Sequence, residues 1–224
     1  MDEWRVRLGA AIALAVAEPD DRRLSFALSG GSRRPLDPTP ADDGERIRAL
    51  VELAQGGDAE AFGQLYDHYV SGIFRFVYFR VGTTQLAEDL TAETFLRALR
   101  SLHTFQWKGK DFAAWLTTIA RNLTHDHYKS RRTRSEFSTD ALPDRPDPGR
   151  GPESEALSTL SHDELMQAVA GLPAEQRDCV LMRFVQDLSI AETAQVLGRS
   201  EGAVKQLQLR AVRNLAKKLR PEAS

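Results

Sequence analysis

The chain lacks the features that mark several protein classes. Cys179 is the single cysteine among 224 residues, which excludes a disulfide framework and suits a reducing, cytoplasmic setting. Glycine-rich phosphate loops, nucleophile elbows and paired catalytic carboxylates are missing, so we predict that the protein is not an enzyme. His103, His125 and His127 lack cysteine or acidic partners at metal-ligand spacing, so we predict no metal and no other cofactor.

Long hydrophobic runs are also missing. A membrane-spanning helix needs roughly 20 apolar residues, and the nearest candidate is the shorter run LGAAIALAVA at residues 8–17. This run ends in an Ala-Val-Ala sequence that resembles a signal-peptidase site, but residues 1–7 carry no net positive charge before it. We predict no membrane insertion and interpret the run as a short helix that docks on the body of the protein.

A large net charge is missing too, because the chain as a whole carries −2. The charges are nevertheless segregated. Residues 199–220 hold seven basic residues and one acid, residues 119–134 hold five and one, and residues 135–164 hold eight acids and two arginines. Local potential governs association with a polyanion, so the two basic segments count for more than the balanced total. They suggest a protein that grips DNA at two places.

Helical periodicity dominates the chain, and strand patterns are few. Residues 1–45 form an N-terminal extension, in which residues 18–45 are rich in Pro, Asp, Gly and Ser and indicate a flexible or regulatory segment. Residues 46–134 form a first helical domain, residues 135–160 an acidic, Pro-rich linker, and residues 161–224 a second helical domain of four helices. The predicted fold class is all-α, with two small helical domains joined by a flexible linker and a helix-turn-helix in the C-terminal one.

The segment at residues 86–102 predicts a helix with two different faces. Leu90, Thr94 and Ala98 share the core side. On the other side, positions i, i+4, i+7 and i+11 form one continuous stripe of Asp89, Glu93, Leu96 and Arg100. An acidic stripe that contains a leucine suits docking on a basic partner helix, with an ordinary solvated face as the alternative.

The next long helix, at residues 112–132, carries the first basic segment. Its core stripe consists of Leu116, Ile119 and Leu123. The outward polar residues, with aromatic and basic side chains just upstream, are candidate contacts to nucleic acid: Phe105, Trp107, Lys108, Arg121, Asn122, Asp126, Lys129, Arg131 and Arg132. Aromatic rings stack on unpaired bases, and cations meet phosphates. In the alternative interpretation, Trp107 is a hydrophobic clasp.

The last quarter of the chain carries the most specific motif. Ala194, Gly198 and Val204 stand five, nine and fifteen places along residues 190–210. A helix-turn-helix needs that spacing, because a small residue lets the helices touch, a glycine permits the turn and a β-branched residue anchors the second helix. Residues 161–164 and 189–192 both read as capping boxes that open helices.

The second helix of this motif offers candidate DNA contacts. With the turn before it, they are Arg199, Ser200, Lys205, Gln206, Leu209, Arg210 and Arg213. Lys205 and Gln206 can pair with base edges, and Leu209 is predicted to point outward and meet a thymine methyl. The arginines suit phosphates, which position a protein without specifying sequence. Gln208 falls on the buried side, where the sequence shows no partner for it.

Together these residues resemble the extracytoplasmic-function sigma factors, the compact promoter-reading subunits of bacterial RNA polymerase. The resemblance covers residues 46–220. AEDLTAETFLRAL resembles the family's polymerase-docking helix, FAAWLTTIARNLTHDHYKSRR its promoter-melting and minus-ten-reading helix, and LPAEQRDCVLMRFVQDLSIAETAQVLGRSEGAVKQLQLRAV its minus-thirty-five-reading domain. The resemblance implies a sigma region 2-like domain at 46–134 and a sigma region 4-like domain at 161–224.

The resemblance also implies partners and roles in the first domain. The partners would be core RNA polymerase, promoter DNA and an anti-sigma factor. Asp89 and Glu93 would contact the polymerase. Asn122 would help hold a base flipped out of the minus-ten element, in a pocket shaped by the loop of residues 103–109. Ala92 stands where the family commonly has Gln, so that contact is not expected.

In the second domain, the resemblance implies that Lys205, Gln206 and Leu209 read the minus-thirty-five element and that Arg210 holds phosphate. Leu207 stands where the family often has Arg or a similar residue, which leaves the groove preference at that position open. We also hypothesise that the acidic linker covers the basic helices in the free protein. Residues 1–45 are either an inhibitory or processed segment or an inert tail.

Two other functions stay open from the sequence. A helix-turn-helix regulator that binds duplex DNA independently of polymerase explains residues 161–220 but leaves the acidic stripe at 89–100 without a purpose. A helical protein that binds RNA or single strands leaves the helix-turn-helix without one.

Overall fold

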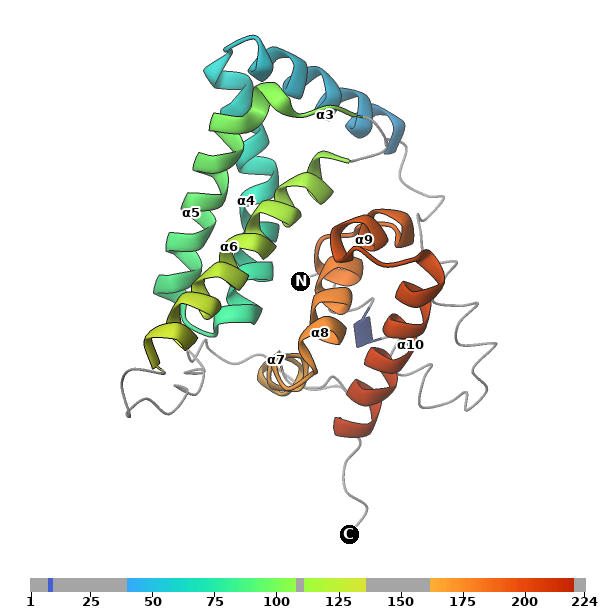
Figure 1. Cartoon of the computed structure of the whole chain (residues 1–224). Helices are drawn as coiled ribbons and strands as arrows, with labels where there is room; N and C mark the ends of the chain where they lie inside the picture. The colour runs from blue at the N-terminus through green and yellow to red at the C-terminus, as the bar shows by residue number, and fades with distance from the viewer. Residues whose placement is uncertain (1–7, 10–39, 108–110, 136–161, 220–224) are drawn as a thin grey trace.

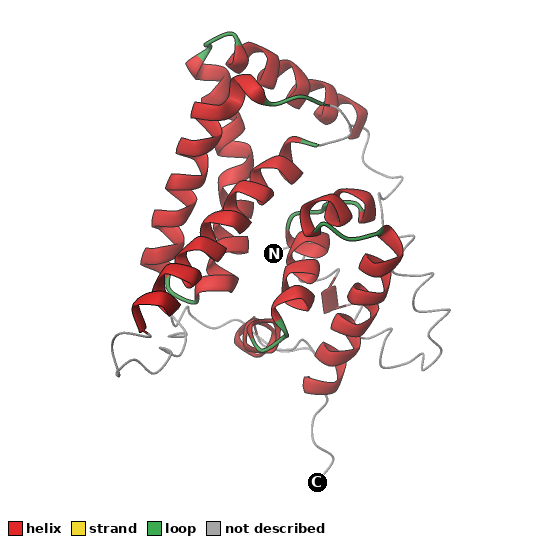
Figure 2. Cartoon of the chain, viewed as in Figure 1, coloured by secondary structure: helices red, strands yellow, loops and turns green. Residues whose placement is uncertain are grey.

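The fold is seen in a computed structural model, which describes residues 8–9, 40–107, 111–135 and 162–219. The regular elements within those ranges are helices, with no strand among them (Figure 1 and Figure 2). In chain order they are α3 (Pro40–Gln55), α4 (Ala59–Val81), α5 (Thr84–Ser101), η1 (Leu102–Thr104), α6 (Phe112–Ser135), α7 (His162–Ala170), α8 (Ala174–Val180), η2 (Leu181–Val185), α9 (Ile190–Leu197) and α10 (Glu201–Lys218). The predicted all-α fold class is confirmed.

Four helices, α3 to α6, form the N-terminal bundle. Asp58 caps α4, because its side-chain Oδ1 accepts hydrogen bonds from the backbone N–H groups of Glu60 at 2.9 Å and Ala61 at 3.0 Å. These donors have no partner within the helix. Gly82 ends α4 with a φ of 78°, a left-handed conformation that glycine adopts without strain. α4 packs against α3, α5 and α6 and is therefore the centre of the bundle.

The first helix of this bundle begins earlier than the composition predicts. α3 starts at Pro40, inside the segment interpreted as flexible at 18–45. Proline is favoured in a first helical turn, because its missing N–H would have no partner there. Ile47, Leu50, Val51 and Ala54 then follow helical spacing and are buried, which holds α3 on the bundle. The rest of that segment, residues 18–39, lies outside the described residues, as do residues 136–160 of the predicted linker.

The C-terminal bundle contains α7 to α10. α7 ends at the sequence Gly171-Leu172-Pro173, and α8 runs on into the π-helical segment η2. Ser189 and Glu192 form the predicted capping box of α9. The Ser189 N–H donates to the Glu192 carboxylate at 2.6 Å, and the Glu192 N–H donates to Ser189 Oγ at 3.2 Å. The other predicted box begins at residue 161, outside the described residues.

The two bundles pack on each other and share a hydrophobic core. α6 contacts α9, and α4 contacts both α7 and η2. Figure 1 shows α4 and α6 lying between α5 and the C-terminal helices. Phe76 and Leu116 of the first bundle belong to the same buried cluster as Leu181 and Leu215 of the second. Leu8 is fully buried in this cluster, and with Gly9 it makes up the described part of the predicted N-terminal docking run.

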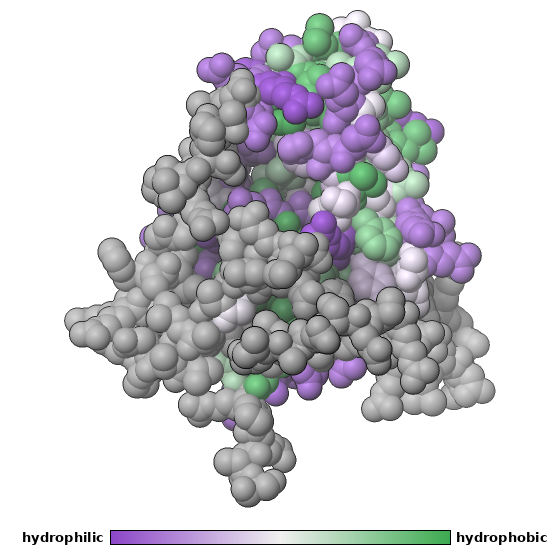
Figure 3. All heavy atoms as spheres, turned by 180° about the vertical axis from the view of Figure 1, so that it is seen from behind, coloured by the Kyte–Doolittle hydropathy of each residue, from purple (hydrophilic) through white to green (hydrophobic). Residues whose placement is uncertain are grey.

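The outer surface is a mosaic. From behind, the coloured part of the surface mixes hydrophilic residues with small groups of hydrophobic ones (Figure 3). In the described ranges, no helix is long and apolar enough to cross a membrane. The large apolar side chains that are exposed by 40% or more in those ranges are Leu53, Tyr66, Leu96, Leu99 and Tyr128. Two of these, Leu96 and Leu99, lie on α5.

Candidate functional site

The exposed face of α5 carries the predicted docking stripe. Asp89, Leu96 and Arg100 are exposed, and Glu93 is half-buried. The Glu93 carboxylate accepts a hydrogen bond from Arg97 Nε at 2.7 Å, in a solvent-exposed pair that contributes little to stability. Leu99, exposed by 50%, adds a second apolar side chain that the stripe pattern missed. We call Asp89, Glu93, Leu96, Leu99 and Arg100 the α5 surface.

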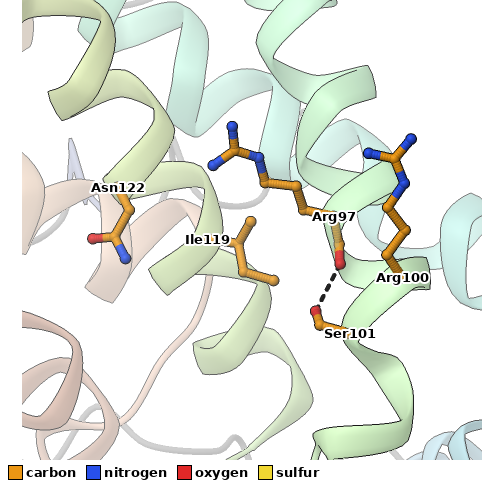
Figure 4. A pocket seen from close by; sticks show the side chains of 5 residues that line it. All are labelled: Arg97, Arg100, Ser101, Ile119 and Asn122. Carbon is orange, nitrogen blue, oxygen red and sulfur yellow. Dashed lines mark hydrogen bonds between the residues drawn. The ribbon is translucent and has the colours of Figure 1, made fainter.

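An open cavity of about 330 Å³ adjoins the α5 surface. Figure 4 shows that Arg97, Arg100 and Ser101 line it from α5, while Ile119 and Asn122 face them from α6. The Ser101 hydroxyl donates to the Arg97 carbonyl at 2.6 Å. The cavity therefore presents an amide, two guanidinium groups and an apolar wall, which can bind a nucleobase and its phosphate. The sequence patterns placed Arg100 and Asn122 in separate roles, whereas the fold brings them to one cavity.

The loop that follows η1 buries the aromatic ring of Phe105, which the sequence predicts to be available to nucleic acid. Phe105 is 5% exposed and packs against Trp107, Phe112 and Trp115, with ring centroids 5.1–5.4 Å apart. The prediction that Phe105 stacks on a base is therefore wrong, because the chain turns inward after η1 and the ring closes the end of the core. Gln55 fixes this turn by donating from Nε2 to the carbonyls of Leu102 and Phe105, each at 2.9 Å.

Trp107 is half-buried and takes the clasp position that the alternative interpretation gave it. Its ring packs edge-on against Phe105, and the Arg48 guanidinium lies 5.2 Å from the ring centroid. These contacts leave less of the ring for a base than the sequence suggests. Lys108, the third candidate in this loop, lies outside the described residues.

The candidates on α6 divide into two groups. Asn122, Asp126 and Lys129 are exposed, as predicted. Arg121 is half-buried and turned toward the C-terminal bundle, where its Nε lies 3.3 Å from Asp178 Oδ2. The helix continues through residues 131 and 132, but the side chains of Arg131 and Arg132 are outside what the structure describes.

The helix-turn-helix has the geometry that its spacing predicts. Ala194 and Val204 are buried, and Gly198 turns the chain with a φ of 64°. The Ser200 hydroxyl caps α10 by accepting from the Ala203 N–H at 3.2 Å. Ser200 therefore has a structural role whether or not it meets DNA.

Most candidates on α10 are accessible, with one correction. Lys205, Gln206 and Arg210 are exposed, and Arg213 is half-buried. Leu209 is 3% exposed, so the prediction that it points outward to a thymine methyl is wrong. α10 packs against both α8 and α9, and this double contact widens its buried face beyond a single stripe.

Two polar residues of this domain acquire partners that the sequence did not show. Gln208 is 2% exposed, and its Oε1 accepts a hydrogen bond from Arg183 Nε at 3.1 Å. Arg183 is itself 3% exposed and also donates to the Leu188 carbonyl. Arg199, a candidate DNA contact, forms an exposed ion pair with Glu175 at 2.7 Å.

Two buried ionisable side chains, those of Cys179 and Tyr69, have raised pKa values because they are packed in the core. Burial raises the pKa of the Cys179 thiol to about 12, so the thiol is neutral at ordinary pH and not a nucleophile. Burial, followed by the charges of Asp111 and Glu192, raises the pKa of the Tyr69 hydroxyl above its usual range. Glu192 belongs to α9, so its effect on Tyr69 of α4 reflects the close packing of the two bundles.

Comparisons with known proteins decide the family. Residues 65–134 match the family Sigma-70 region 2, and residues 162–215 match Sigma-70, region 4. The chain is 52% identical over 186 residues to the ECF RNA polymerase sigma factor BldN of Streptomyces coelicolor. This match covers 83% of this chain and 70% of that protein. The chain belongs to the extracytoplasmic-function sigma factors. This sigma factor therefore serves promoter-specific transcription initiation with RNA polymerase and is not an independent helix-turn-helix regulator.

Further relatives agree with this assignment. The ECF sigma factor SigD of Mycobacterium tuberculosis is 30% identical over 184 residues, covering 80% of this chain and 87% of its own. The fold is similar to that of the sigma factor RpoE in a co-crystal structure with the anti-sigma factor NepR from Bartonella quintana, with a TM-score of 0.64 and 22% identity. That match covers 73% of this chain and 99% of the other.

Proposed function

We propose that this sigma factor docks on core RNA polymerase through the α5 surface and reads promoter DNA with α6 and α10. One observation carries the proposal: the exposed α5 surface and the open cavity meet at Arg100, which belongs to both. A polymerase subunit bound along α5 would therefore stand next to the place where Asn122 faces solvent. Docking and strand opening would be coupled through this shared edge.

The proposed mechanism opens DNA without chemistry by the protein itself. Extruding one base from the stack costs a few kcal/mol. The cavity can offset this cost, because the Asn122 amide can hydrogen-bond a base edge while Arg97 and Arg100 attract the neighbouring phosphate. Tethering by the polymerase adds a high effective concentration of both DNA-reading bundles.

In the C-terminal bundle, we assign sequence reading to Lys205 and Gln206 and phosphate binding to Arg210, all of which are exposed on α10. Leu209 drops out of this set, because its side chain is in the core. We further propose a cytoplasmic location and regulation by an anti-sigma factor, the kind of partner that RpoE binds in its co-crystal structure with NepR.

Run-off transcription with purified core polymerase tests the proposal, on promoters mapped from transcript starts after induced expression. Asp89→Arg combined with Glu93→Arg should abolish promoter-dependent transcripts and core binding while helix content stays unchanged. Glu45→Arg combined with Glu52→Arg makes the same charge change at exposed positions of α3 and is the matched control. Equal core binding by the two double variants would contradict docking through α5.

The same assay tests the cavity. Asn122→Ala should lower the transcript yield on duplex promoters, and a template with a mismatched, already open minus-ten region should restore it, because the cost of opening has been removed. A defect of equal size on both templates would show that Asn122 acts elsewhere than in strand opening.

A further inference from the structure

Arg48 of α3 lies beside the loop that leads from η1 to α6. Its guanidinium carbon is 5.2 Å from the centroid of the Trp107 ring, which makes a cation–π contact. Arg48 is exposed, and it forms no ion pair within the part of the chain that the structure describes. Glu45 and Glu52, about one turn away on either side, therefore leave its charge unpaired. We call Arg48 and Trp107 the α3–loop pair.

The α3–loop pair is fixed at the end of the N-terminal bundle. Gln55, also on α3, donates to the carbonyls of Leu102 and Phe105 and so joins α3 to the turn before Trp107. The Trp107 ring packs edge-on against the buried Phe105. Its indole Nε1 is buried without a hydrogen-bond acceptor among the described residues, so ring packing and Arg48 hold the ring in place. In return, the ring favours one position of the Arg48 guanidinium.

The α3–loop pair lies near the cavity between α5 and α6. Ser101 ends α5 and lines this cavity, and Trp107 follows it after six residues. Their Cα atoms are therefore at most about 20 Å apart. Figure 1 shows α3 crossing the end of the bundle at which α5 ends. The phosphates of one strand are spaced about 3.4 Å apart along a duplex, so a strand held in the cavity can reach the pair within about six nucleotides.

We propose that Arg48 is a further DNA-binding residue, which binds a phosphate of the strand that is opened at the cavity. The inference rests on the proposed role of the cavity in holding an extruded base. An exposed guanidinium without an acidic partner matches a phosphate in charge and in the fork of its N–H donors. Trp107 is a positioning residue, because its ring holds Arg48 through the cation–π contact.

The two members of the pair should affect binding in different ways. A phosphate contact on a single strand contributes about 0.7 to the slope of log affinity against log salt concentration. Losing it therefore removes about a 2.6-fold part of the affinity change between about 50 and 200 mM salt. Without its ring partner, Arg48 still reaches a phosphate but has to be ordered first, which weakens binding by about twofold to twelvefold with no change of slope.

Three substitutions on α3 separate the charge from the fold. Arg48→Met removes the charge and keeps an unbranched side chain, whereas Arg48→Lys keeps the charge. Arg46→Met is the matched control, because Arg46 is exposed on the same helix but lies on a different face. Trp107→Leu removes the ring and keeps an apolar side chain. Circular dichroism checks the fold, and the Arg48 variants decide the test if Trp107→Leu loses helix content.

Binding is measured with polymerase reconstituted from purified core and each variant. Fluorescence anisotropy follows a labelled single strand from the minus-ten region of a mapped promoter, over a series of salt concentrations. A scrambled strand of the same composition measures sequence-independent binding, and core polymerase alone gives the background. The affinity of each variant for core polymerase is measured separately.

We expect Arg48→Met to weaken binding to both strands equally and to lower the salt slope by about 0.7, while Arg48→Lys and Arg46→Met keep the wild-type slope. Trp107→Leu should bind about twofold to twelvefold more weakly at the wild-type slope. Equal slopes for Arg48→Met and Arg46→Met would overturn the inference. So would weaker core binding by Arg48→Met, because it would assign Arg48 to the polymerase interface instead.

The proposed function fails in a different way in the same experiment. Asn122→Ala should narrow the difference in affinity between the promoter strand and the scrambled strand, because a group that contacts a base has been lost. An unchanged difference would contradict the role of the cavity while the change in slope for Arg48→Met stands. A narrowed difference with an unchanged slope for Arg48→Met would remove the α3–loop pair alone.

Discussion

The contact between Arg183 and Gln208 makes a quantitative prediction about the C-terminal bundle. Arg183 lies in η2 and Gln208 in α10, and both side chains are at most 3% exposed. Their hydrogen bond of 3.1 Å ties the DNA-reading helix to the segment after α8. Replacing Gln208 by Met keeps an unbranched side chain of similar length and takes away the acceptor of a buried cation.

The magnitude follows from the kind of bond. A hydrogen bond to a charged group contributes about 1.5–3 kcal/mol, and a buried donor left unpaired bears the cost of its desolvation. Gln208→Met should therefore lower the free energy of unfolding by about 1.5–3 kcal/mol. If the C-terminal bundle unfolds as a unit of its own, that loss lowers its Tm by about 6–24 °C. Gln206→Met, two residues earlier and exposed, should stay within about 0.5 kcal/mol of the wild type.

Urea unfolding followed by far-ultraviolet circular dichroism measures the change. Trp107 and Trp115 belong to the N-terminal part, so their fluorescence shows whether that bundle unfolds in the same step. A double-mutant cycle of Gln208→Met with Arg183→Met isolates the interaction between the two side chains. The double variant should lose much less free energy of unfolding than the two single variants added together. A Gln208→Met variant within about 0.5 kcal/mol of wild type, or additive losses in the cycle, would refute the reasoning.

Two further predictions concern Cys179 and the glycines of the helix-turn-helix. Because burial raises the Cys179 pKa to about 12, the folded protein keeps a proton that the unfolded chain loses above about pH 8.5. The contribution of the buried thiol to the free energy of unfolding is therefore fully present below that pH. It falls by up to about 1.4 kcal/mol per pH unit as the pH rises toward 12. Urea unfolding at pH 9 and 10 should show a steeper loss for wild type than for Cys179→Ala, and parallel slopes would contradict it. Gly198→Ala should cost about 1–2 kcal/mol because of its φ of 64°, whereas Gly202→Ala, in the first turn of α10 with open space around it, should gain up to about 1 kcal/mol. Thermal melts of both variants check these opposite signs.

Local patterns in the sequence were sufficient for the elements and for most exposed candidates. The spacing of Ala194, Gly198 and Val204 depends on contacts within one motif, and the structure reproduces it. The stripe from Asp89 to Arg100 likewise follows from helical geometry alone. Such features need no knowledge of where distant segments pack, which explains why they could be predicted.

The errors arose where one helix meets more than one neighbour. A helical wheel places Leu209 outside because it assumes a single buried face, but α10 packs on both α8 and α9. The sequence predicts that Phe105 meets nucleic acid because the residue stands among cations, yet its ring is buried in the core. The cavity of Arg97, Arg100 and Asn122 and the partner of Gln208 each join segments far apart in the chain, and no local period carries that information.

The position of α5 adds a consequence for the order of events at a promoter. In Figure 1, α5 stands at the outer edge of the N-terminal bundle, with α4 and α6 between it and the C-terminal helices. The α5 surface is therefore exposed while the two bundles are packed on each other. Docking on α5, as we propose it, does not require the bundles to separate first. If polymerase binds the separated bundles more tightly than the packed ones, it favours their separation once it has docked.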